Sequence, residues 1–260
     1  MPSPPAELAE LPAETLTWQL IVDRDGQPGA ENMAADQALL ESVAAGGPAM
    51  LRLYRFRPAA LSLGRNEPTR RYDRSEIAAL SVDVVRRPTG GRAVWHEHEL
   101  TYAVAAPIAA FGSLRESYAA IHARLAAALR ALGAPATLAP ARPMGPLRAT
   151  PCFGSSVGGE VLVHGRKVVG SAQVRRGDAF LQHGSILLAG SQALVYRLAG
   201  EPVGTETNLT AVLGRAVAFD EVAASVSAAF ACDVARAVAT RPPPPALTAP
   251  FRDPTWTWRR

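Results

Sequence analysis

Short runs of apolar residues, bounded by glycine, proline or charged residues, recur along the first hundred positions of the chain. Such runs of about four to eight residues are typical of β-strands. They occur in the segments TWQLIVD, AMLRLYRF, ALSLG, VDVVRR, AVWH and ELTYAVAA. Two helices are expected among them, one from about Asn32, a candidate N-cap, and a short one over residues 73–80. The apolar face of the first helix contains Met33, Leu40 and Val43.

The middle of the chain combines one long helix with a strand meander. Ser113 and Glu116 match a capping box, and the amphipathic helix that they open is expected to end at Gly133. The stretch 134–150 is rich in proline and small residues, which predicts a loop without regular pairing. The segments GEVLVHGRKVVGSAQVRR and AFLQHGSILL then predict strands joined by tight turns that contain glycine.

The C-terminal third changes character from strands to helices. Helical patterns occur in SQALVYRLAG, TNLTAVLG and FDEVAASVSAAFA. The last segment, RPPPPALTAPFRDPTWTWRR, is expected to be irregular and partly ordered by its tryptophans. The chain is therefore expected to have a disordered tail over residues 1–16, a single domain over residues 17–240 and a proline-rich tail over residues 241–260.

The composition fits a globular protein. Of the 260 residues, 48% are hydrophobic and 19% are charged, which allows a sizeable core. No run of about 18 apolar residues occurs, and the N-terminus lacks the basic and apolar regions of a signal peptide, so neither a membrane helix nor secretion is expected. Cys152 and Cys232 lie far apart and form no metal-binding spacing. We expect both to be reduced and the protein to be cytoplasmic.

The basic side chains are spread along the chain. The net charge of +4 is too small and too scattered to favour a nucleic acid as partner. Arginine pairs occur at positions 70–71, 86–87 and 175–176. They fit solvated surface charges and a docking surface for an acidic protein equally well.

One basic residue differs from all the others. Lys167 is the only lysine among 27 lysines and arginines. A lone lysine is often a surface charge, but Lys167 precedes the apolar pair Val168 and Val169 and a run of small residues, as where a strand enters a core. An ammonium can lose its proton when it is desolvated, whereas a guanidinium stays charged. Lys167 is therefore a candidate for chemistry.

Three other segments contain candidate functional residues, and each also has a simpler structural interpretation. His96 and His98 would point the same way on a strand, which suits a metal, but no third ligand is apparent and we expect no metal site. Gly90 and Gly91 match neither a Walker A nor a GxGxxG pattern and fit a tight turn. Cys152 lies in a loop rather than in an apolar periodic run, which favours exposure to a cleft over burial.

Three segments in this order resemble a known family. RRPTGGRAVWHEHELTYAV, the CF at Cys152 and Phe153, and GRKVVGSAQVRRGDAFLQHGSILL closely resemble the LipM-type octanoyltransferases of the lipoate and biotin protein ligase superfamily. ENMAADQALL and LRLYRFRPAALSLGRNEP extend the resemblance to roughly residues 17–230. It implies an α+β catalytic domain in which a mixed, largely antiparallel sheet, flanked by helices, surrounds an acyl-binding cleft.

The resemblance also implies an activity and partners. A family member transfers octanoyl from acyl carrier protein to a lysine of a lipoyl-domain protein, commonly the glycine-cleavage H protein. No cofactor, ATP, nucleic acid or membrane is implied, and a monomer is expected. The acidic partner proteins would dock through arginines such as Arg70, Arg71 and Arg175.

Residue roles follow from the same resemblance. The family nucleophile matches Cys152, and Lys167 matches the family lysine that supplies charge, holds the acyl carbonyl oxygen and exchanges a proton. An aliphatic residue is usual in the family where this chain has Trp95, so the bulkier ring is expected to shorten the acyl pocket. The expected substrate-binding residues are Arg87, Gly90, Gly91, Arg92, His96, Val168, Gly170, Ala172, His183 and Gly184.

Three alternatives stay open from sequence. An ATP-dependent lipoate-protein ligase shares the fold and the lysine but does not need Cys152. Ligases often carry GGG in the loop, where this chain has Arg92 after Gly90 and Gly91. An octanoyl amidotransferase that acts from the H protein on dehydrogenase subunits would also use a cysteine. A noncatalytic protein that binds acyl groups or lipoyl domains would need neither Cys152 nor Lys167.

Overall fold

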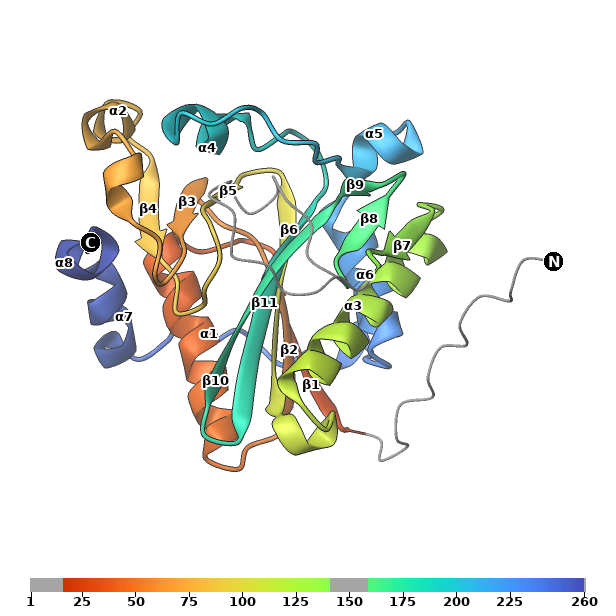
Figure 1. Cartoon of the computed structure of the whole chain (residues 1–260). Coiled ribbons are helices and arrows are strands. Elements are labelled where there is room, and N and C mark those ends of the chain that lie inside the picture. Colours follow the sequence, from red (N-terminus) through yellow and green to blue (C-terminus); the bar gives the residue numbers. More distant parts are fainter. Residues whose placement is uncertain (1–15, 141–158, 260) are drawn as a thin grey trace.

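A five-stranded mixed sheet forms the centre of the molecule (Figure 1). The computed structural model describes residues 16–140 and 159–259. The strands lie in the order β1 (Trp18–Val22), β2 (Ala49–Tyr54), β6 (Glu99–Pro107), β11 (Ala179–Leu187) and β10 (Val169–Arg176). Only the pairing of β1 with β2 is parallel within this sheet. The α+β class with a mixed, largely antiparallel sheet is thus confirmed.

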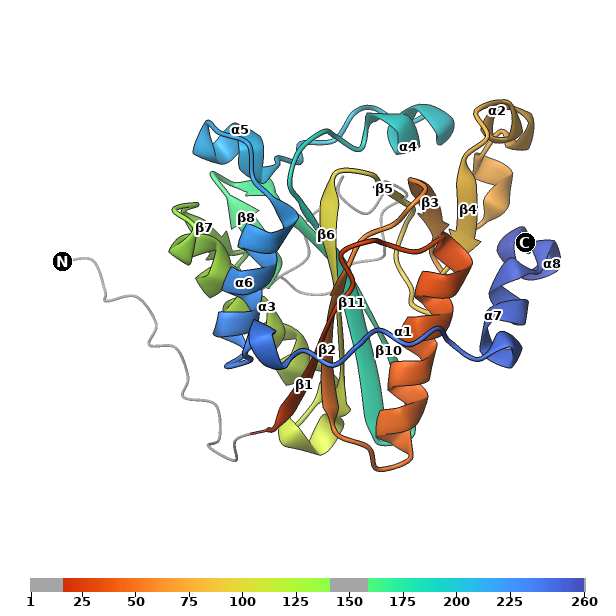
Figure 2. The ribbon, with the colours of Figure 1, turned by 180° about the vertical axis from the view of Figure 1, so that it is seen from behind.

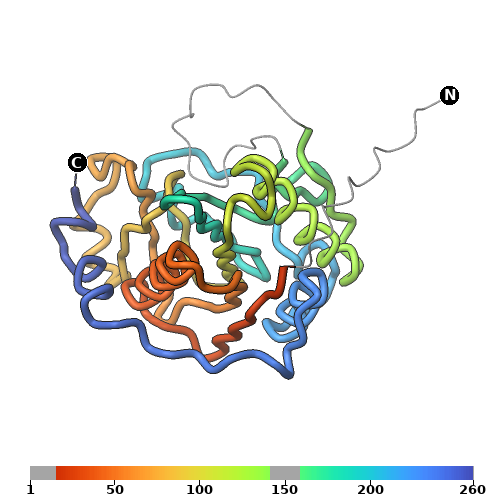
Figure 3. Tube along the Cα trace, turned by 90° about the horizontal axis from the view of Figure 1, so that it is seen from below, coloured from red at the N-terminus to blue at the C-terminus, as the bar shows by residue number. Residues whose placement is uncertain are grey.

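Helices cover both faces of this sheet. Helix α1 (Gly29–Ala44) packs on one face, and α3 (Leu114–Ala131) and α6 (Phe219–Ala229) pack on the other (Figures 1 and 3). Successive residues of β2 therefore enter different cores: Leu51 contributes to the core under α3 and α6, and Met50 to the core under α1. Because both faces are covered, β6 and β11 are buried along most of their length.

Local sequence signals correctly predicted where two helices start. Asp73 caps α2 (Arg74–Ala79) by accepting from the backbone N–H groups of Ser75 and Glu76. The side chain of Ser113 accepts from the backbone N–H of Glu116 at the start of α3, as the capping box predicts.

The prediction that Asn32 caps α1 is wrong. The helix begins one turn earlier, with Pro28 at the N-cap position, and Asn32 is buried inside it. Its side-chain Nδ2 donates to the carbonyls of Gln27 and Arg55, and its Oδ1 accepts from Arg52. The amide thus satisfies buried polar groups from distant segments, which outweighs the local preference of asparagine for a helix cap.

Two small sheets flank the central one. The first has the order β4 (Asp83–Arg86), β3 (Ala60–Leu63) and β5 (Val94–His96), and the second has the order β7 (Ala136–Leu138), β8 (Val161–Val163) and β9 (Arg166–Lys167). The strand β7 corrects the prediction of an unpaired loop from residue 134. It pairs with a partner more than twenty residues away, and such a partner leaves no local signal.

The helical C-terminal third is confirmed, but its tail is more regular than expected. The predicted helices are α4 (Ala193–Leu198), α5 (Leu209–Leu213) and α6. After α6 the chain crosses past β1 to the side of α1 (Figure 2). There it forms α7 (Pro245–Arg252) and α8 (Pro254–Thr257), so the prediction of an irregular tail is wrong.

Tertiary contacts hold this tail. The guanidinium of Arg86 is fully buried and donates to the carbonyls of Trp256, Thr257 and Arg259. In return, the indole N–H of Trp256 donates to the Arg86 carbonyl at 2.9 Å, so the tryptophan does help to order the tail. Phe251 is buried in the core under α1. Within residues 16–140 and 159–259, no helix is both long and apolar enough to cross a membrane.

Candidate active site

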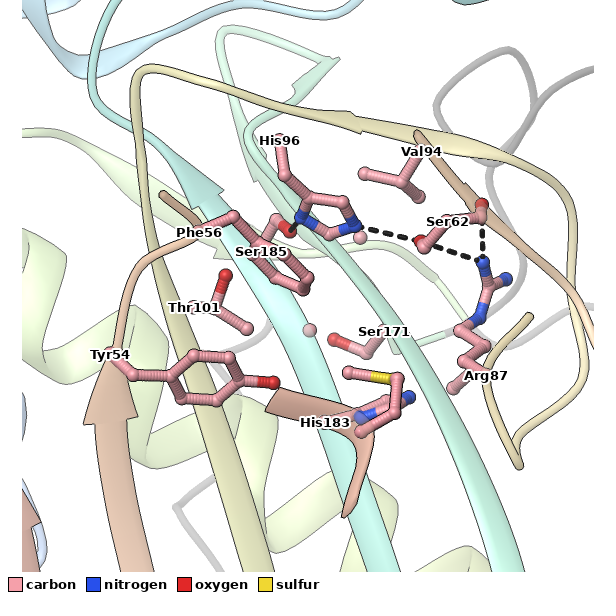
Figure 4. A pocket seen from close by; sticks show the side chains of 14 residues that line it. Tyr54, Phe56, Ser62, Arg87, Val94, His96, Thr101, Ser171, His183 and Ser185 are labelled. Atoms are coloured by element: carbon pink, nitrogen blue, oxygen red, sulfur yellow. Dashed lines mark hydrogen bonds between the residues drawn. The ribbon is translucent and has the colours of Figure 1, made fainter. Parts of the chain in front are cut away.

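A narrow pocket opens where β6, β10 and β11 approach the small sheet of β3 and β5 (Figure 4). It encloses about 340 Å³ of empty space, part of it open to solvent. Its wall is apolar on the side of α1 and β2 and rich in hydroxyl and imidazole groups elsewhere. It is formed by Met33, Tyr54, Phe56, Ser62, Arg87, Val94, His96, Thr101, Gly170, Ser171, Ala172, His183, Gly184 and Ser185.

Strand register brings these residues together. Thr101 on β6 lies opposite Ser185 on β11, and His183 lies opposite Ala172 on β10. Gly184 must be glycine, because a Cβ at this position would lie 2.3 Å from the Gly170 carbonyl oxygen. The strands of the two segments AFLQHGSILL and GEVLVHGRKVVGSAQVRR, β11 and β10, therefore form one wall.

Six of the predicted substrate-binding residues line this pocket: Arg87, His96, Gly170, Ala172, His183 and Gly184. Gly91 does not line the pocket; it has a positive φ of 86°, and a Cβ at this position would lie 2.9 Å from the Arg87 Nη2 and 4.0 Å from the Ala172 Cβ. The carbonyls of Gly90 and Arg92 accept from the guanidinium of Arg87 and fix the loop around it. Val168 is apart from this group, since it is fully buried in the core under α3 and α6.

Lys167 lies at the end of β9 and is buried. Its side chain is 5% exposed, and its Nζ donates to Oε1 of Glu160 at 2.5 Å. Glu160, which the sequence analysis missed, is buried as well. A charged pair removed from water in this way is costly unless its geometry is good, so its presence favours a role beyond stability. Cys152 and Phe153 lie outside the described residues.

The expectation that Trp95 shortens the pocket is wrong. Trp95 lies between Val94 and His96 on β5, and strand alternation sends its ring to the opposite side from theirs. It packs at the edge of the core around Tyr196. Its indole N–H donates to Glu97 at 3.1 Å.

The two histidines of the HEHE segment lie in different environments. β5 ends at His96, which is buried, whereas the side chain of His98 is 58% exposed. They therefore do not face one site, contrary to the geometry of an uninterrupted strand. In the part of the chain that the structure describes, no group of three or more histidine, cysteine or acidic side chains is arranged to hold a metal ion.

His183 belongs to a buried polar network behind the pocket. Its Nδ1 donates to Asp36 at 2.8 Å, and its Nε2 bonds to the hydroxyl of Thr89 at 2.6 Å. Asp36 also accepts from the hydroxyl of Tyr54 and from Arg52. The sequence analysis missed Asp36 and Thr89. A signal existed for Asp36, because it shares the predicted apolar face of α1 with Met33, Leu40 and Val43 at helical spacing.

A second network joins the pocket to α3. The Nε2 of His122 bonds to the hydroxyl of Ser171, which also bonds to the Tyr102 hydroxyl at 2.6 Å. The Nδ1 of His122 lies 2.7 Å from the Gly159 carbonyl oxygen. Because a carbonyl only accepts, Nδ1 carries the proton and Nε2 accepts from Ser171. The sequence analysis did not single out this histidine, whose partners come from distant segments.

Burial changes the pKa values of groups in both networks. Desolvation lowers the pKa of His122 to about 4, against the opposing effect of its bond to the Gly159 carbonyl. Desolvation also lowers the pKa of His183, although Asp36 opposes that change. The pKa of the Tyr54 hydroxyl is raised well above its usual value by burial and then by the charge of Asp36. Both histidines are therefore neutral at pH 7.

His122 should make the fold sensitive to acid. Its pKa is about 4 in the folded protein and near 6.5 in the unfolded chain, so the unfolded state binds more protons between these values. Lowering the pH from 7 to 4.5 is expected to remove about 2 to 3 kcal/mol of stability through this group. Urea unfolding at both pH values measures the loss. In His122→Gln, whose amide can serve both neighbours, the decrease should be smaller by that amount; an equal decrease in the two proteins would contradict the assignment.

The sequence matches one family of proteins over most of its length. The model of the lipoyl protein ligase A/B catalytic domain matches residues 28–231. The chain is 45% identical over 177 residues to octanoyltransferase LipM of Carboxydothermus hydrogenoformans, which covers 66% of this chain and 65% of that protein. It is 37% identical over 235 residues to octanoyltransferase LipM of Symbiobacterium thermophilum, which covers 82% of this chain and 85% of that protein.

Solved structures share the fold. The crystal structure of lipoate-protein ligase A bound with ATP has a TM-score of 0.74 at 19% identity and covers 93% of this chain and 97% of that one. A chain from a structure of the bi-partite lipoate protein ligase and its E2 lipoyl domain of Thermoplasma acidophilum has a TM-score of 0.68 at 20% identity and covers 94% and 96%. At such identities the likeness concerns the fold alone, which agrees with the fold expected from sequence.

Proposed function

The chain belongs to the lipoyl protein ligase A/B catalytic domain family and, within it, to the LipM-type octanoyltransferases, and from this premise we propose its reaction. It moves an octanoyl group, in the cytoplasm, from acyl carrier protein to a lysine of a lipoyl-domain protein such as the glycine-cleavage H protein. The acyl group passes through a thioester on Cys152. ATP is not consumed, because the donor thioester is already activated.

The observation that carries this proposal is the position of Lys167. Lys167 lies two residues before β10, whose Gly170 and Ser171 line the pocket. Its charge is the smaller of the two effects that lower the pKa of His122, which bonds to Ser171. An ammonium paired with Glu160 is thus held in a desolvated place near the pocket wall, where its electrostatic interactions are stronger than in water. This is the environment in which an ammonium stabilises a thiolate and the oxyanion of a tetrahedral intermediate.

The proposed reaction has two steps. The Cys152 thiolate attacks the donor carbonyl carbon, the carrier thiolate leaves and takes a proton from Lys167, and an octanoyl-cysteine thioester remains. The acceptor amine then attacks this thioester, restores that proton to Lys167 and forms the amide, and the Cys152 sulfur is released. Lys167 would hold the carbonyl oxygen in both steps. The role of Cys152 is supported by the match of its motif to the family.

The docking of the two acidic partners stays a proposal. Arg70 and Arg71 lie just before α2, whereas Arg175 lies near the β10–β11 turn, at the other end of the molecule (Figure 1). Arg71 pairs with Glu201, and Arg175 lies 3.5 Å from Asp178. The three arginines therefore do not form one patch, and a single partner would use one of the two groups.

Intact-protein mass spectrometry tests the reaction. The chain is mixed with octanoyl acyl carrier protein without ATP, and then with an apo lipoyl domain. We expect a hydroxylamine-labile octanoyl adduct that moves to the lipoyl domain, and no adduct on Cys152→Ala. Acceptor modification only with ATP and free octanoate would indicate a ligase instead. Modification of dehydrogenase lipoyl domains only from octanoyl H protein would indicate the amidotransferase.

A further inference from the structure

We propose that Ser62, His96 and Glu99 form a second catalytic array in the pocket, a Ser–His–Glu triad that hydrolyses medium-chain acyl esters. This activity is separate from transfer through Cys152, and only its acyl chain length rests on the proposed function. All three side chains come from the small sheet and the adjoining start of β6, and Ser62 and His96 line the pocket (Figure 4).

The distances are those of an activated serine. The Ser62 Oγ lies 2.7 Å from the His96 Nε2, and the His96 Nδ1 lies 2.6 Å from the Glu99 Oε1. A carboxylate only accepts, so Nδ1 carries the ring proton of the neutral histidine. Nε2 is then free to accept the proton of the Ser62 hydroxyl. A nucleophile that is bonded to a base, which a third group orients, is the arrangement on which serine hydrolases depend.

The surroundings of Glu99 favour proton transfer to His96. Glu99 is 3% exposed, and its Oε1 also accepts from the hydroxyl of Thr101. Its Oε2 has no hydrogen-bond partner among the described residues. A buried carboxylate that is not fully satisfied is costly, and a positive charge on the adjacent imidazole offsets that cost. The ring of His96 is held in place by stacking on Phe56, with centroids 4.1 Å apart.

Arg87 supplies a positive charge at the nucleophile. Its Nη1 donates to the Ser62 Oγ at 3.2 Å and to the Ser62 carbonyl at 3.1 Å. The carbonyls of Gly90 and Arg92 hold the rest of the guanidinium. A fixed cation next to the serine oxygen stabilises negative charge as it develops there and on a carbonyl oxygen bound beside it.

A second serine–histidine pair, of which Ser171 lines the same pocket, lacks these features. The Ser171 hydroxyl bonds to the Nε2 of His122, but the Nδ1 of His122 is bonded to a backbone carbonyl instead of a carboxylate. Burial also makes His122 a weak base, with a pKa of about 4. Of these two serines, the structure therefore favours Ser62 as the nucleophile.

The reaction balances with water as its only co-reactant. The Ser62 oxygen bonds to the ester carbonyl carbon as its proton moves to His96. The alcohol then leaves with that proton, and an acyl-serine ester remains. Water attacks this ester and gives a proton to His96, which returns it to the Ser62 oxygen as the carboxylic acid is released. The net reaction is an ester plus water giving an acid and an alcohol.

Hydrolysis of 4-nitrophenyl octanoate by the full chain tests the proposal. All variants carry Cys152→Ala, so that the thiol cannot contribute. We expect Ser62→Ala and His96→Asn each to lower kcat/KM about 100-fold or more. The matched control is Ser225→Ala, a serine of α6 whose hydroxyl donates to a backbone carbonyl outside the pocket. It should hydrolyse the ester as its parent does. A folded Ser62→Ala variant with the parental rate would overturn the proposal.

Labelling with an alkyl fluorophosphonate identifies the nucleophilic serine directly and needs no substitution in the pocket. Peptide mapping of the labelled Cys152→Ala chain should place the phosphonate on Ser62. An adduct on Ser171 or another serine, or no adduct, would refute the array even if Ser62→Ala fails to fold. Failure of the octanoyl transfer reaction is recognised separately, because it is read from the hydroxylamine-labile adduct and the modified lipoyl domain.

Discussion

Replacing Lys167 by methionine should lower octanoyl transfer about 1,000-fold or more. Removing one preorganised oxyanion donor costs about 100- to 1,000-fold, and losing a general acid–base group adds to that loss. Methionine keeps most of the aliphatic length of lysine, so the change mainly removes the ammonium. The rate is measured as octanoyl lipoyl domain formed per unit time, by intact mass, at saturating octanoyl acyl carrier protein.

The same substitution also disturbs the fold, and this effect can be separated. Without Lys167, the buried carboxylate of Glu160 loses its cation at 2.5 Å. Leaving one member of a buried pair typically costs about 3–5 kcal/mol. The double variant Lys167→Met/Glu160→Gln replaces the charge by a neutral amide and should recover most of this stability without recovering transfer. If the double variant is stable and transfers octanoyl at the normal rate, Lys167 has no catalytic role.

Lys167 also shows what the sequence could predict about the site. It is the only lysine of the chain and apolar residues follow it, which indicated a desolvated ammonium. The burial of its side chain confirms this prediction. The Gly-Gly loop and the β10–β11 segments were identified as one site, because their motifs resemble a family. Six of the ten predicted binding residues, among them Arg87 and His183, line the pocket.

The missed residues share a physical cause. Glu160 is seven residues from Lys167, Asp36 is 147 residues from His183, and Ser62 is 34 residues from His96. Side-chain pairs of this kind depend on how strands and helices pack, and periodicity describes only one element at a time. The family motifs contain the histidines but do not say which carboxylate or hydroxyl faces each nitrogen.

The errors in the fold have the same origin. The strand β7 exists because β8 lies beside it, and the tail is helical over Pro245–Arg252 because it packs against α1. Local composition in both segments favours irregular structure, and tertiary contact outweighs it. The helices and strands with their own apolar periodicity, such as α3 and β6, were predicted close to their observed ends.

Replacing Arg52 by methionine should destabilise the folded protein by about 3–5 kcal/mol. The guanidinium is 2% exposed, lies 2.9 Å from Asp36 and 3.4 Å from Asp23, and also bonds to Asn32. Methionine would leave two buried carboxylates without their cation. Urea unfolding at pH 7 measures the change. The control is Arg24→Met, which removes an exposed ion pair with Asp220 and should change stability by less than about 0.5 kcal/mol.

Loss of Arg52 should also impair the active site, although this residue does not line the pocket. Asp36 accepts from Arg52, from the Tyr54 hydroxyl and from His183, and His183 holds Thr89 in the Gly-Gly loop. Without the arginine, the charge of Asp36 is balanced only by these neutral donors, so their positions should become less fixed. We therefore expect slower octanoyl transfer from Arg52→Met even under conditions in which it is fully folded. Equal stability of Arg52→Met and Arg24→Met would show that the network does not hold this side of the pocket together.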